Sequence, residues 1–176
     1  MIEFEGVGHD YDQRTVLDGV DLRLAEQRVA FVGANGSGKS TLARMINGLV
    51  HPTRGRVLVD GVDPARDGRA VRRRVWFVFT HPDSQIVMPT AGEDVAFSLR
   101  KQGLSKAERQ RRAAEVLAQH GLAGYAEHPA HQLSGGQKQL LALCSMLVLD
   151  PDVLVCDEPT TLLDLRNTRM LTDVFA

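Results

Sequence analysis

Residues 33–41 limit the possible folds of this chain more than any other segment. They read Gly-Ala-Asn-Gly-Ser-Gly-Lys-Ser-Thr, which is a glycine, four residues and then Gly-Lys-Ser. An apolar run at residues 29–32 precedes this loop, and apolar residues with helical spacing follow it at residues 41–49. A glycine-rich loop that joins a buried strand to a helix is typical of a parallel α/β sheet that binds phosphate.

The residue types in this loop are those that an anion site requires. Glycines let backbone N–H groups approach phosphate oxygens without clashes from Cβ atoms, and the positive N-terminal end of the next helix favours the same anion. Lys39 then reaches the β- and γ-phosphates, and the Ser40 hydroxyl ligates Mg²⁺. A chance glycine-rich turn is the alternative. The candidate nucleotide-binding residues of the loop are Gly33, Asn35, Gly36, Ser37, Gly38, Lys39, Ser40 and Thr41.

A second signal is a pair of adjacent carboxylates, Asp157 and Glu158, after the apolar run at residues 153–156. Open α/β sheets bind ligands at the carboxyl ends of their strands. We expect Asp157 to hold Mg²⁺, directly or through water, and Glu158 to orient and polarise an attacking water. Alone, this pattern also fits an ordinary strand end. Beside a phosphate loop, it becomes the expected magnesium partner.

Hydrophobic patterning predicts alternating strands and helices. The predicted strands lie at residues 2–4, 16–24, 29–32, 56–59, 75–79 and 153–156. The predicted helices lie at residues 41–49, about 105–120 and 136–149, and Ser105 and Glu108 have the spacing of a capping box. We expect one domain over residues 1–176, with a core at 1–82 and 138–176 and a helical insertion at about 83–137.

Charge and cysteine usage exclude several other classes of protein. The chain has 21 Lys and Arg against 22 Asp and Glu, so it lacks the basic excess of a nucleic-acid binder, and we expect no nucleic-acid partner. Its two cysteines, Cys144 and Cys156, lie in apolar stretches, which favours a reducing compartment over a disulfide scaffold. The N-terminus has no signal-peptide pattern, and the apolar run at residues 140–149 is shorter than a membrane span.

The string Leu-Ser-Gly-Gly-Gln at residues 133–137 is a third signal. Taken alone, Ser134 is an ordinary helix N-cap, although a capped helix start over glycines is also an anion site. Between a phosphate loop and an Asp-Glu strand, the string resembles the signature of ABC transporters. The whole chain resembles their ATP-binding subunit. The resemblance implies an α/β fold: a P-loop NTPase core with a mainly parallel sheet, antiparallel N-terminal strands and an inserted helical subdomain.

The resemblance also implies ligands and a second copy. It implies ATP and Mg²⁺, with Lys39 and Glu158 as catalytic residues, and a homodimer or heterodimer of ATPase subunits packed head to tail. The nucleotide held by the phosphate loop of one copy would contact the signature of the other copy, namely Ser134, Gly136 and Gln137.

Two further residues match the family at single positions. Tyr11 matches the aromatic residue that stacks on adenine, and its alternative is an exposed tyrosine in a turn. Asp164 matches a loop that lies along the dimer interface, and its alternative is the cap of a helix.

The chain departs from the family pattern in two places. Thr80 stands where the family usually has a Gln that ligates Mg²⁺ and senses the membrane partner; its shorter hydroxyl can contact Mg²⁺ or a bound water, so Thr80 is a candidate metal residue. Gln85 lies five residues on and resembles a second Gln of the energy-coupling-factor branch, so we expect it either at the coupling site or as the substitute for the missing Gln. The chain also ends at Ala176, before a family strand whose His contacts the γ-phosphate, and all six His precede Asp157. We therefore expect a truncated domain that hydrolyses ATP weakly or not at all.

Residues 80–87 and 160–167 resemble the energy-coupling-factor importers, nearest to the biotin-uptake ATPases and next to those for cobalt or nickel. The resemblance implies a subunit that energises import of a vitamin or a transition-metal ion. It would sit at the cytoplasmic face of the membrane, bound to integral membrane subunits. The alternatives are a soluble ABC ATPase and a nucleotide-gated dimerisation module, neither of them coupled to transport.

Overall fold

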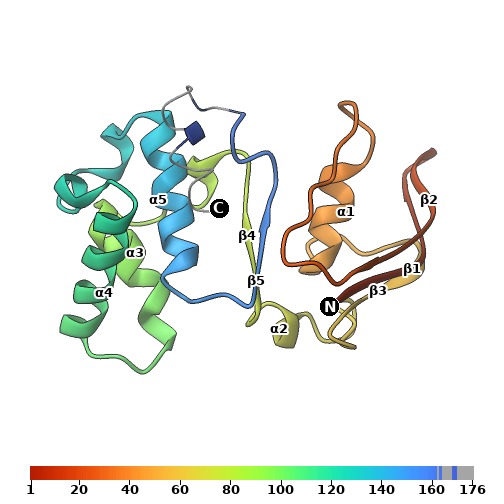
Figure 1. The fold of residues 1–176 in the computed structure, drawn as a ribbon, viewed down its shortest axis with the longest axis horizontal. Helices are drawn as coiled ribbons and strands as arrows, with labels where there is room; N and C mark the ends of the chain where they lie inside the picture. The colour runs from red at the N-terminus through yellow and green to blue at the C-terminus, as the bar shows by residue number, and fades with distance from the viewer. Residues whose placement is uncertain (162, 164–167, 170–176) are drawn as a thin grey trace. The chain divides into compact units, whose positions relative to one another are not determined.

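The computed structural model describes residues 1–161, 163, 168 and 169. The chain is an α/β protein with antiparallel N-terminal strands and a parallel strand pair, and it divides into two compact units, Met1–Trp76 and Phe77–Ala176 (Figure 1). The expected fold class is therefore confirmed.

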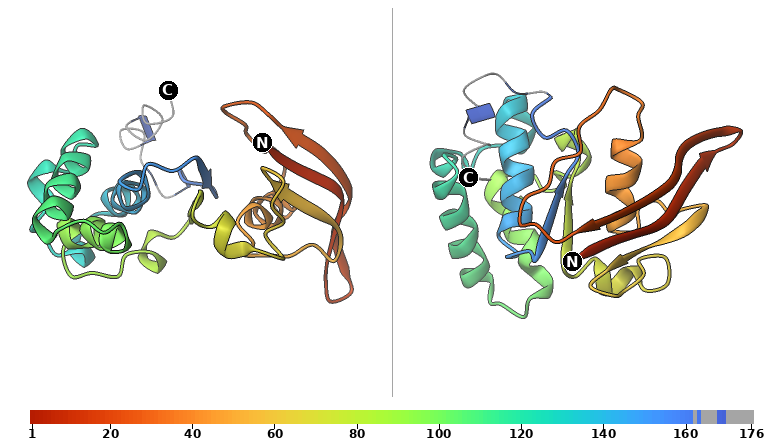
Figure 2. Two further views of the ribbon diagram at one scale, coloured as in Figure 1. Left: turned by 90° about the horizontal axis from the view of Figure 1, so that it is seen from below. Right: turned by 45° about the vertical axis from the view of Figure 1, so that its right-hand side comes forward.

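The first unit is built on a three-stranded antiparallel sheet in the order β2-β1-β3. The strands are β1 (Ile2–Tyr11), β2 (Arg14–Leu24) and β3 (Arg54–Val59), and each includes its predicted stretch. Figure 2 shows β1 and β2 as one long hairpin. Helix α1 (Lys39–Ile46) contacts β3, and the short helix α2 (Gly68–Val71) follows that strand along the chain. The buried side chains of these elements include Phe4, Val7, Leu42, Met45 and Val57.

Two expectations for the first unit are wrong. Residues 29–32 form no strand: the side chain of Val32 is 93% exposed, and no strand in the described part of the chain pairs with this run. An apolar run becomes a buried strand only when a neighbouring strand takes up its N–H and C=O groups. The helix after the loop ends at Ile46 rather than at residue 49, because Gly48 adopts a φ of 72° and Leu49 lies 45% exposed.

Within its described residues, the second unit has three packed helices of eight residues or more and a short strand pair. Helices α3 (Ala91–Ser98), α4 (Lys106–Gln119) and α5 (Gly135–Leu147) contact one another (Figure 1). Strand β5 (Val153–Cys156) pairs with β4 (Val75–Val78), which crosses the boundary between the units. The core draws mainly on leucines of α4 and α5, with Val78 and Val95 beside them. Four 3₁₀ turns connect these elements: η1 (Pro82–Ser84), η2 (Leu99–Lys101), η3 (Ala123–Tyr125) and η4 (Ala130–Gln132).

Side-chain caps set where these helices begin. The Ser105 hydroxyl accepts from the backbone N–H of Glu108, so the expected cap of α4 is present. The carboxylate of Glu108 binds Arg111 and Arg112 instead of closing the capping box. Helix α3 has a full capping box from Thr90 and Glu93, a signal that the sequence analysis missed.

Both cysteines are free thiols, as expected. Burial raises the pKa of the Cys144 thiol to about 12 and that of the Cys156 thiol to about 12, so both stay protonated near neutral pH. None of the helices within the described residues is long and apolar enough to cross a bilayer.

A buried carboxylate, Asp94 on α3, joins distant parts of the second unit. Its Oδ1 atom accepts from the backbone N–H groups of Val87 (2.8 Å) and Met88 (3.0 Å). Its Oδ2 atom accepts from the Ser145 hydroxyl on α5, at 2.9 Å. The residue is only 3% exposed. The loop at residues 87–88 is thereby tied through α3 to α5.

We expect Asp94→Ala to lower the free energy of unfolding by about 2–4 kcal/mol, because three buried donors lose their acceptor. Ser145→Ala removes one of these bonds, and a smaller loss of about 1 kcal/mol is expected. Urea unfolding followed by circular dichroism measures both. Glu127→Ala, at an exposed position of the same unit, serves as the control. A loss for Asp94→Ala no larger than that for this control would contradict the role of the network.

Candidate functional site

The phosphate loop enters α1 through two glycines in the left-handed region. Gly36 has a φ of 78° and Gly38 a φ of 90°, where a residue with a Cβ atom is strained. The backbone N–H of Ser37 donates to the carbonyl of Ala34 at 3.2 Å, which closes the turn. A Cβ atom on Gly38 would lie 2.8 Å from Cδ2 of Leu17 on β2. Both the backbone angle and the packing therefore require glycine at position 38.

Lys39, the first residue of α1, folds back over this loop. Its Nζ donates to the carbonyl oxygens of Gly33 (2.9 Å) and Ala34 (3.0 Å). The N-cap residue Gly38 has no side chain, so no N-cap side chain accepts a hydrogen bond from the backbone N–H groups of the first turn of α1. A cation beside an uncapped helix start is an arrangement that accepts phosphate oxygens. The geometry of the loop thus fits the phosphates of a nucleoside triphosphate.

Tyr11 lies at the end of β1 in the same unit. Its side chain is 47% exposed, and its ring meets the ring of His9 edge to face, with 4.5 Å between ring centroids. His9 is buried, and neither ring nitrogen has a hydrogen-bond partner among the described residues. The His9 ring therefore supports Tyr11 by packing. The exposed part of the Tyr11 ring remains open for stacking.

In the second unit, Asp157 and Glu158 follow β5 as expected. Asp157 is buried, and its backbone N–H donates to the carbonyl of Val78 on β4 at 2.9 Å. Glu158 is exposed and has a φ of 50°, a rare conformation for a residue with a Cβ atom. Its carboxylate accepts from the Thr161 hydroxyl at 3.1 Å. A φ in this region is costly for a residue with a Cβ atom, and such conformations cluster at functional sites.

The Thr80 and Gln85 side chains, which follow β4 in the sequence, both bond to nearby backbone groups. The Gln85 amide group accepts from the N–H of Phe79 (2.8 Å) and donates to the carbonyl of Phe77 (3.1 Å). The Thr80 hydroxyl donates to the backbone carbonyl of Asp157 at 2.9 Å. Gln85 therefore ties the end of η1 to β4, whereas Thr80 joins the segments that follow β4 and β5. Their roles at Mg²⁺ and in coupling remain predictions.

The signature residues form the start of α5. The Ser134 hydroxyl accepts from the N–H of Gln137, and the Gln137 side chain accepts from the N–H of Ser134, a full capping box. Ser134 is exposed while Gly136 is buried. The Lys138 ammonium pairs with Asp83 of η1 at 2.7 Å, which links α5 to the turn before Gln85. The helix start predicted at Ser134 is confirmed.

The site residues thus fall into two groups, one in each unit. The phosphate loop and Tyr11 lie in the first unit, and the Asp-Glu pair, Thr80, Gln85 and the signature lie in the second. Asp164 lies outside the described residues. In the part of the chain that the structure describes, no three His, Cys, Asp or Glu side chains converge into a metal cluster. A further residue near the loop, Arg14, was not among the site residues predicted from the sequence; its Nη2 atom lies 3.9 Å from the position that a Cβ atom would take on Gly36. Its one sequence signal was its place directly after the two-residue turn that follows Tyr11.

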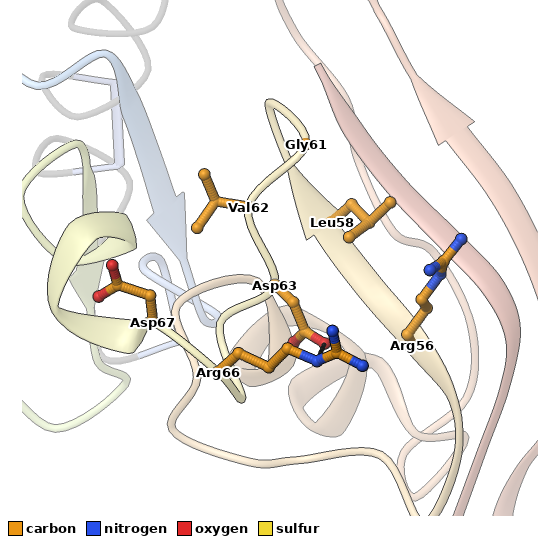
Figure 3. Close-up of a pocket in the computed structure, with 7 residues that line it drawn as sticks. All are labelled: Arg56, Leu58, Gly61, Val62, Asp63, Arg66 and Asp67. Atoms are coloured by element: carbon orange, nitrogen blue, oxygen red, sulfur yellow. Dashed lines mark ion pairs between the residues drawn. The ribbon is translucent and has the colours of Figure 1, made fainter.

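A cavity of about 380 Å³ lies away from the loop, beside β3 (Figure 3). Its charges are already compensated: Arg66 pairs with Asp63 at 3.7 Å, and Arg56 binds Glu5 at 2.5 Å. The Asp67 side chain caps α2. This cavity therefore offers no excess charge to a nucleotide, and the loop remains the candidate site.

Comparison with known proteins agrees with these features. The family model described as ABC transporter matches residues 17–161. The chain belongs to the ABC transporter family. As a member of that family it is an ATP-binding protein with ATPase activity.

Individual relatives and one solved structure are similar over nearly the whole chain. A putative ABC transporter ATP-binding protein of Deinococcus radiodurans is 54% identical, over 95% of this chain and 74% of the relative. The biotin transport ATP-binding protein BioM of Rhizobium etli is 45% identical, over 99% of this chain and 78% of the relative. The solved ATP-binding cassette MJ0796, a dimer bound to ADP and Pi, has a TM-score of 0.85 at 30% identity and covers 99% of this chain and 81% of its own. This ABC family member is thus similar both to transport ATPases and to a dimeric cassette.

Proposed function

We propose that the protein is the ATPase subunit of an importer that takes up a micronutrient through a membrane partner. The single observation that carries the proposal is the loop at residues 33–41, where two left-handed glycines and Lys39 surround an uncapped helix start. An anion site of this kind in an ABC transporter family member supports binding of ATP. Residues 1–176 would act as one ABC ATPase domain.

The residues of the first unit would hold the nucleotide. Residues 33–41 would surround the phosphates through their backbone N–H groups, and Lys39 would contact the β- and γ-phosphates. Tyr11 would stack on the adenine, since its ring is exposed and supported by His9.

The residues of the second unit would supply the hydrolytic chemistry. Glu158 would orient the water that attacks the γ-phosphate. The Asp157 carboxylate of this unit and the Ser40 hydroxyl of the first unit are both oxygen donors of the type that Mg²⁺ prefers, and Thr80 would be a third such donor. When bound, Mg²⁺ neutralises charge that develops on the phosphates.

A second ATPase subunit would complete the site. Cassettes similar to this chain are dimeric. In a head-to-tail pair, Ser134, Gly136 and Gln137 of one copy would face the γ-phosphate held by the other copy. The start of α5 supports this, because Ser134 is exposed at a helix N-terminus that favours an anion. Asp164 would lie along the interface between the copies.

The membrane subunit would dock beside Gln85. A cavity of about 320 Å³ lies there, lined largely by apolar side chains from residues 86–89 and by Ala130, His131 and Asp83. Val87 in this lining is 63% exposed. An exposed apolar lining suits a helix of a partner protein. The protein would then be peripheral, at the cytoplasmic face of the membrane.

The similarity to BioM supports biotin as the solute, with a transition-metal ion as the other candidate.

Transport in membrane vesicles tests this function. Vesicles that contain the intact protein and its membrane subunits should take up radiolabelled biotin, cobalt or nickel. Uptake should require ATP on the side of the membrane that carries the ATPase subunit. Val87→Asp should abolish uptake and co-purification with the membrane subunits, while hydrolysis by the isolated protein stays unchanged. Leu49→Asp, at an exposed apolar position of the first unit, is the control. If the unsubstituted protein hydrolyses ATP but binds no membrane subunit and supports no uptake, a soluble ABC ATPase would be favoured instead.

A further inference from the structure

The hairpin that carries Tyr11 also carries a basic residue on the opposite strand. Tyr11 and Arg14 are cross-strand partners at the end of the β1–β2 hairpin. Between them lies a two-residue turn, Asp12 and Gln13, with Asp12 at a φ of 52°. Directly opposed residues of an antiparallel pair project to the same face of the sheet and contact each other. Arg14 is therefore the immediate neighbour of the side chain proposed to stack on adenine.

The Arg14 side chain reaches the phosphate loop. Its Nη2 atom lies 3.9 Å from the position that a Cβ atom would take on Gly36. Gly36 is in the middle of the loop and has no side chain to separate the guanidinium from the backbone. The loop thus has two cations beside it, with Lys39 on the helix side and Arg14 on the hairpin side.

The acidic residues nearest to Arg14 on the strands themselves, Asp10 and Asp18, are engaged elsewhere, and the ion pairs of the described residues include none between Arg14 and Asp12 of the turn. Asp10 and Asp18 both pair with Arg54, at 3.8 Å and 3.3 Å. A hydrogen bond from Thr15 lowers the pKa of Asp10, so that its charge is kept. Among the ion pairs found within the described residues, none involves Arg14, which is exposed. A guanidinium held next to an anion-binding loop without a carboxylate partner is available for phosphate.

We propose that Arg14 is a second polyphosphate-binding cation of the nucleotide site, acting from the hairpin beside Tyr11. This inference rests on the proposed nucleotide site at residues 33–41. The Arg14 guanidinium would donate hydrogen bonds to phosphate oxygens, whereas Tyr11 would contact the base. The contribution of Arg14 to affinity therefore grows with the number of phosphates on the ligand, and it is small for a nucleoside monophosphate.

Titration calorimetry with ATP, ADP and AMP on the intact protein tests the proposal. Arg14→Gln should weaken ATP binding about tenfold and ADP binding a few-fold, and leave AMP binding unchanged. Arg14→Lys should keep most of the affinity for ATP, since the positive charge remains. Arg23→Gln is the matched control, because Arg23 is an exposed arginine near the other end of β2 and the charge change is the same. Thermal unfolding shows that each variant is folded.

Each result of these titrations decides the proposal. An equal loss for AMP and ATP would mean that Arg14 acts on the base or the hairpin, and an unchanged affinity for ATP would mean that it makes no contact; either overturns the proposal. A loss for Arg23→Gln as large as that for Arg14→Gln would reduce the effect to overall charge. Lys39→Ala separates the two claims. If it abolishes ATP binding while Arg14→Gln changes nothing, the nucleotide site stands and only this inference fails. If the unsubstituted protein binds no ATP, both fail.

Discussion

Glu158→Gln is expected to lower the steady-state rate of ATP hydrolysis at least about 100-fold while ATP still binds, because a positioned general base contributes 100-fold or more. Glu158 lies two residues after the end of β5 and has a φ of 50°. Its side chain is exposed and accepts a hydrogen bond from Thr161. The amide of Gln has nearly the same shape as the carboxylate. It has no negative charge with which to polarise water, so that binding and catalysis separate.

Phosphate release and equilibrium ATP binding, measured on the same samples of the intact protein, check this expectation. Glu127→Gln is the control, since it makes the same chemical change at another exposed site of the second unit. Hydrolysis by Glu158→Gln at more than a tenth of the unsubstituted rate would show that another group activates the water.

Lys39→Ala is expected to weaken ATP binding by about 100-fold or more, which corresponds to about 2.7 kcal/mol. The substitution removes the cation proposed to face the phosphates and also both hydrogen bonds that Nζ makes to Gly33 and Ala34. The loop would lose its shape as well as its charge. The loss should decrease as the number of phosphates on the ligand falls, because the β- and γ-phosphates are the expected partners of Lys39.

Calorimetric titration with ATP and ADP measures this effect. Lys101→Ala removes an exposed lysine of the second unit and should leave both affinities unchanged. Lys39→Arg keeps the charge in a larger, planar group, so a partial loss would separate the contribution of shape from that of charge. ATP binding by Lys39→Ala within a few-fold of the unsubstituted protein would place the nucleotide somewhere other than this loop.

Local sequence predicted many elements of the fold because their signals act over a few residues. The caps at Ser105 and Ser134 lie three residues from the N–H groups that they bind, and the strand at residues 153–156 is a continuous apolar run. The run at residues 29–32 carried a similar signal, yet the structure leaves it without a strand partner among the described residues. Hydrophobicity alone does not supply that partner, so this prediction was wrong.

The amino-acid sequence by itself determined the chemistry of the candidate site: a glycine loop with Lys39, two carboxylates after a strand, and a serine at a helix start. Only the tertiary structure decided which distant groups meet. Asp94 bonds Ser145, 51 residues away, Gln85 closes on the edge of β4, and Arg14 reaches Gly36. Backbone conformation and capping depend on near neighbours, which a sequence shows directly. Contacts between distant segments depend on how sheets and helices pack, and no local pattern contains that information.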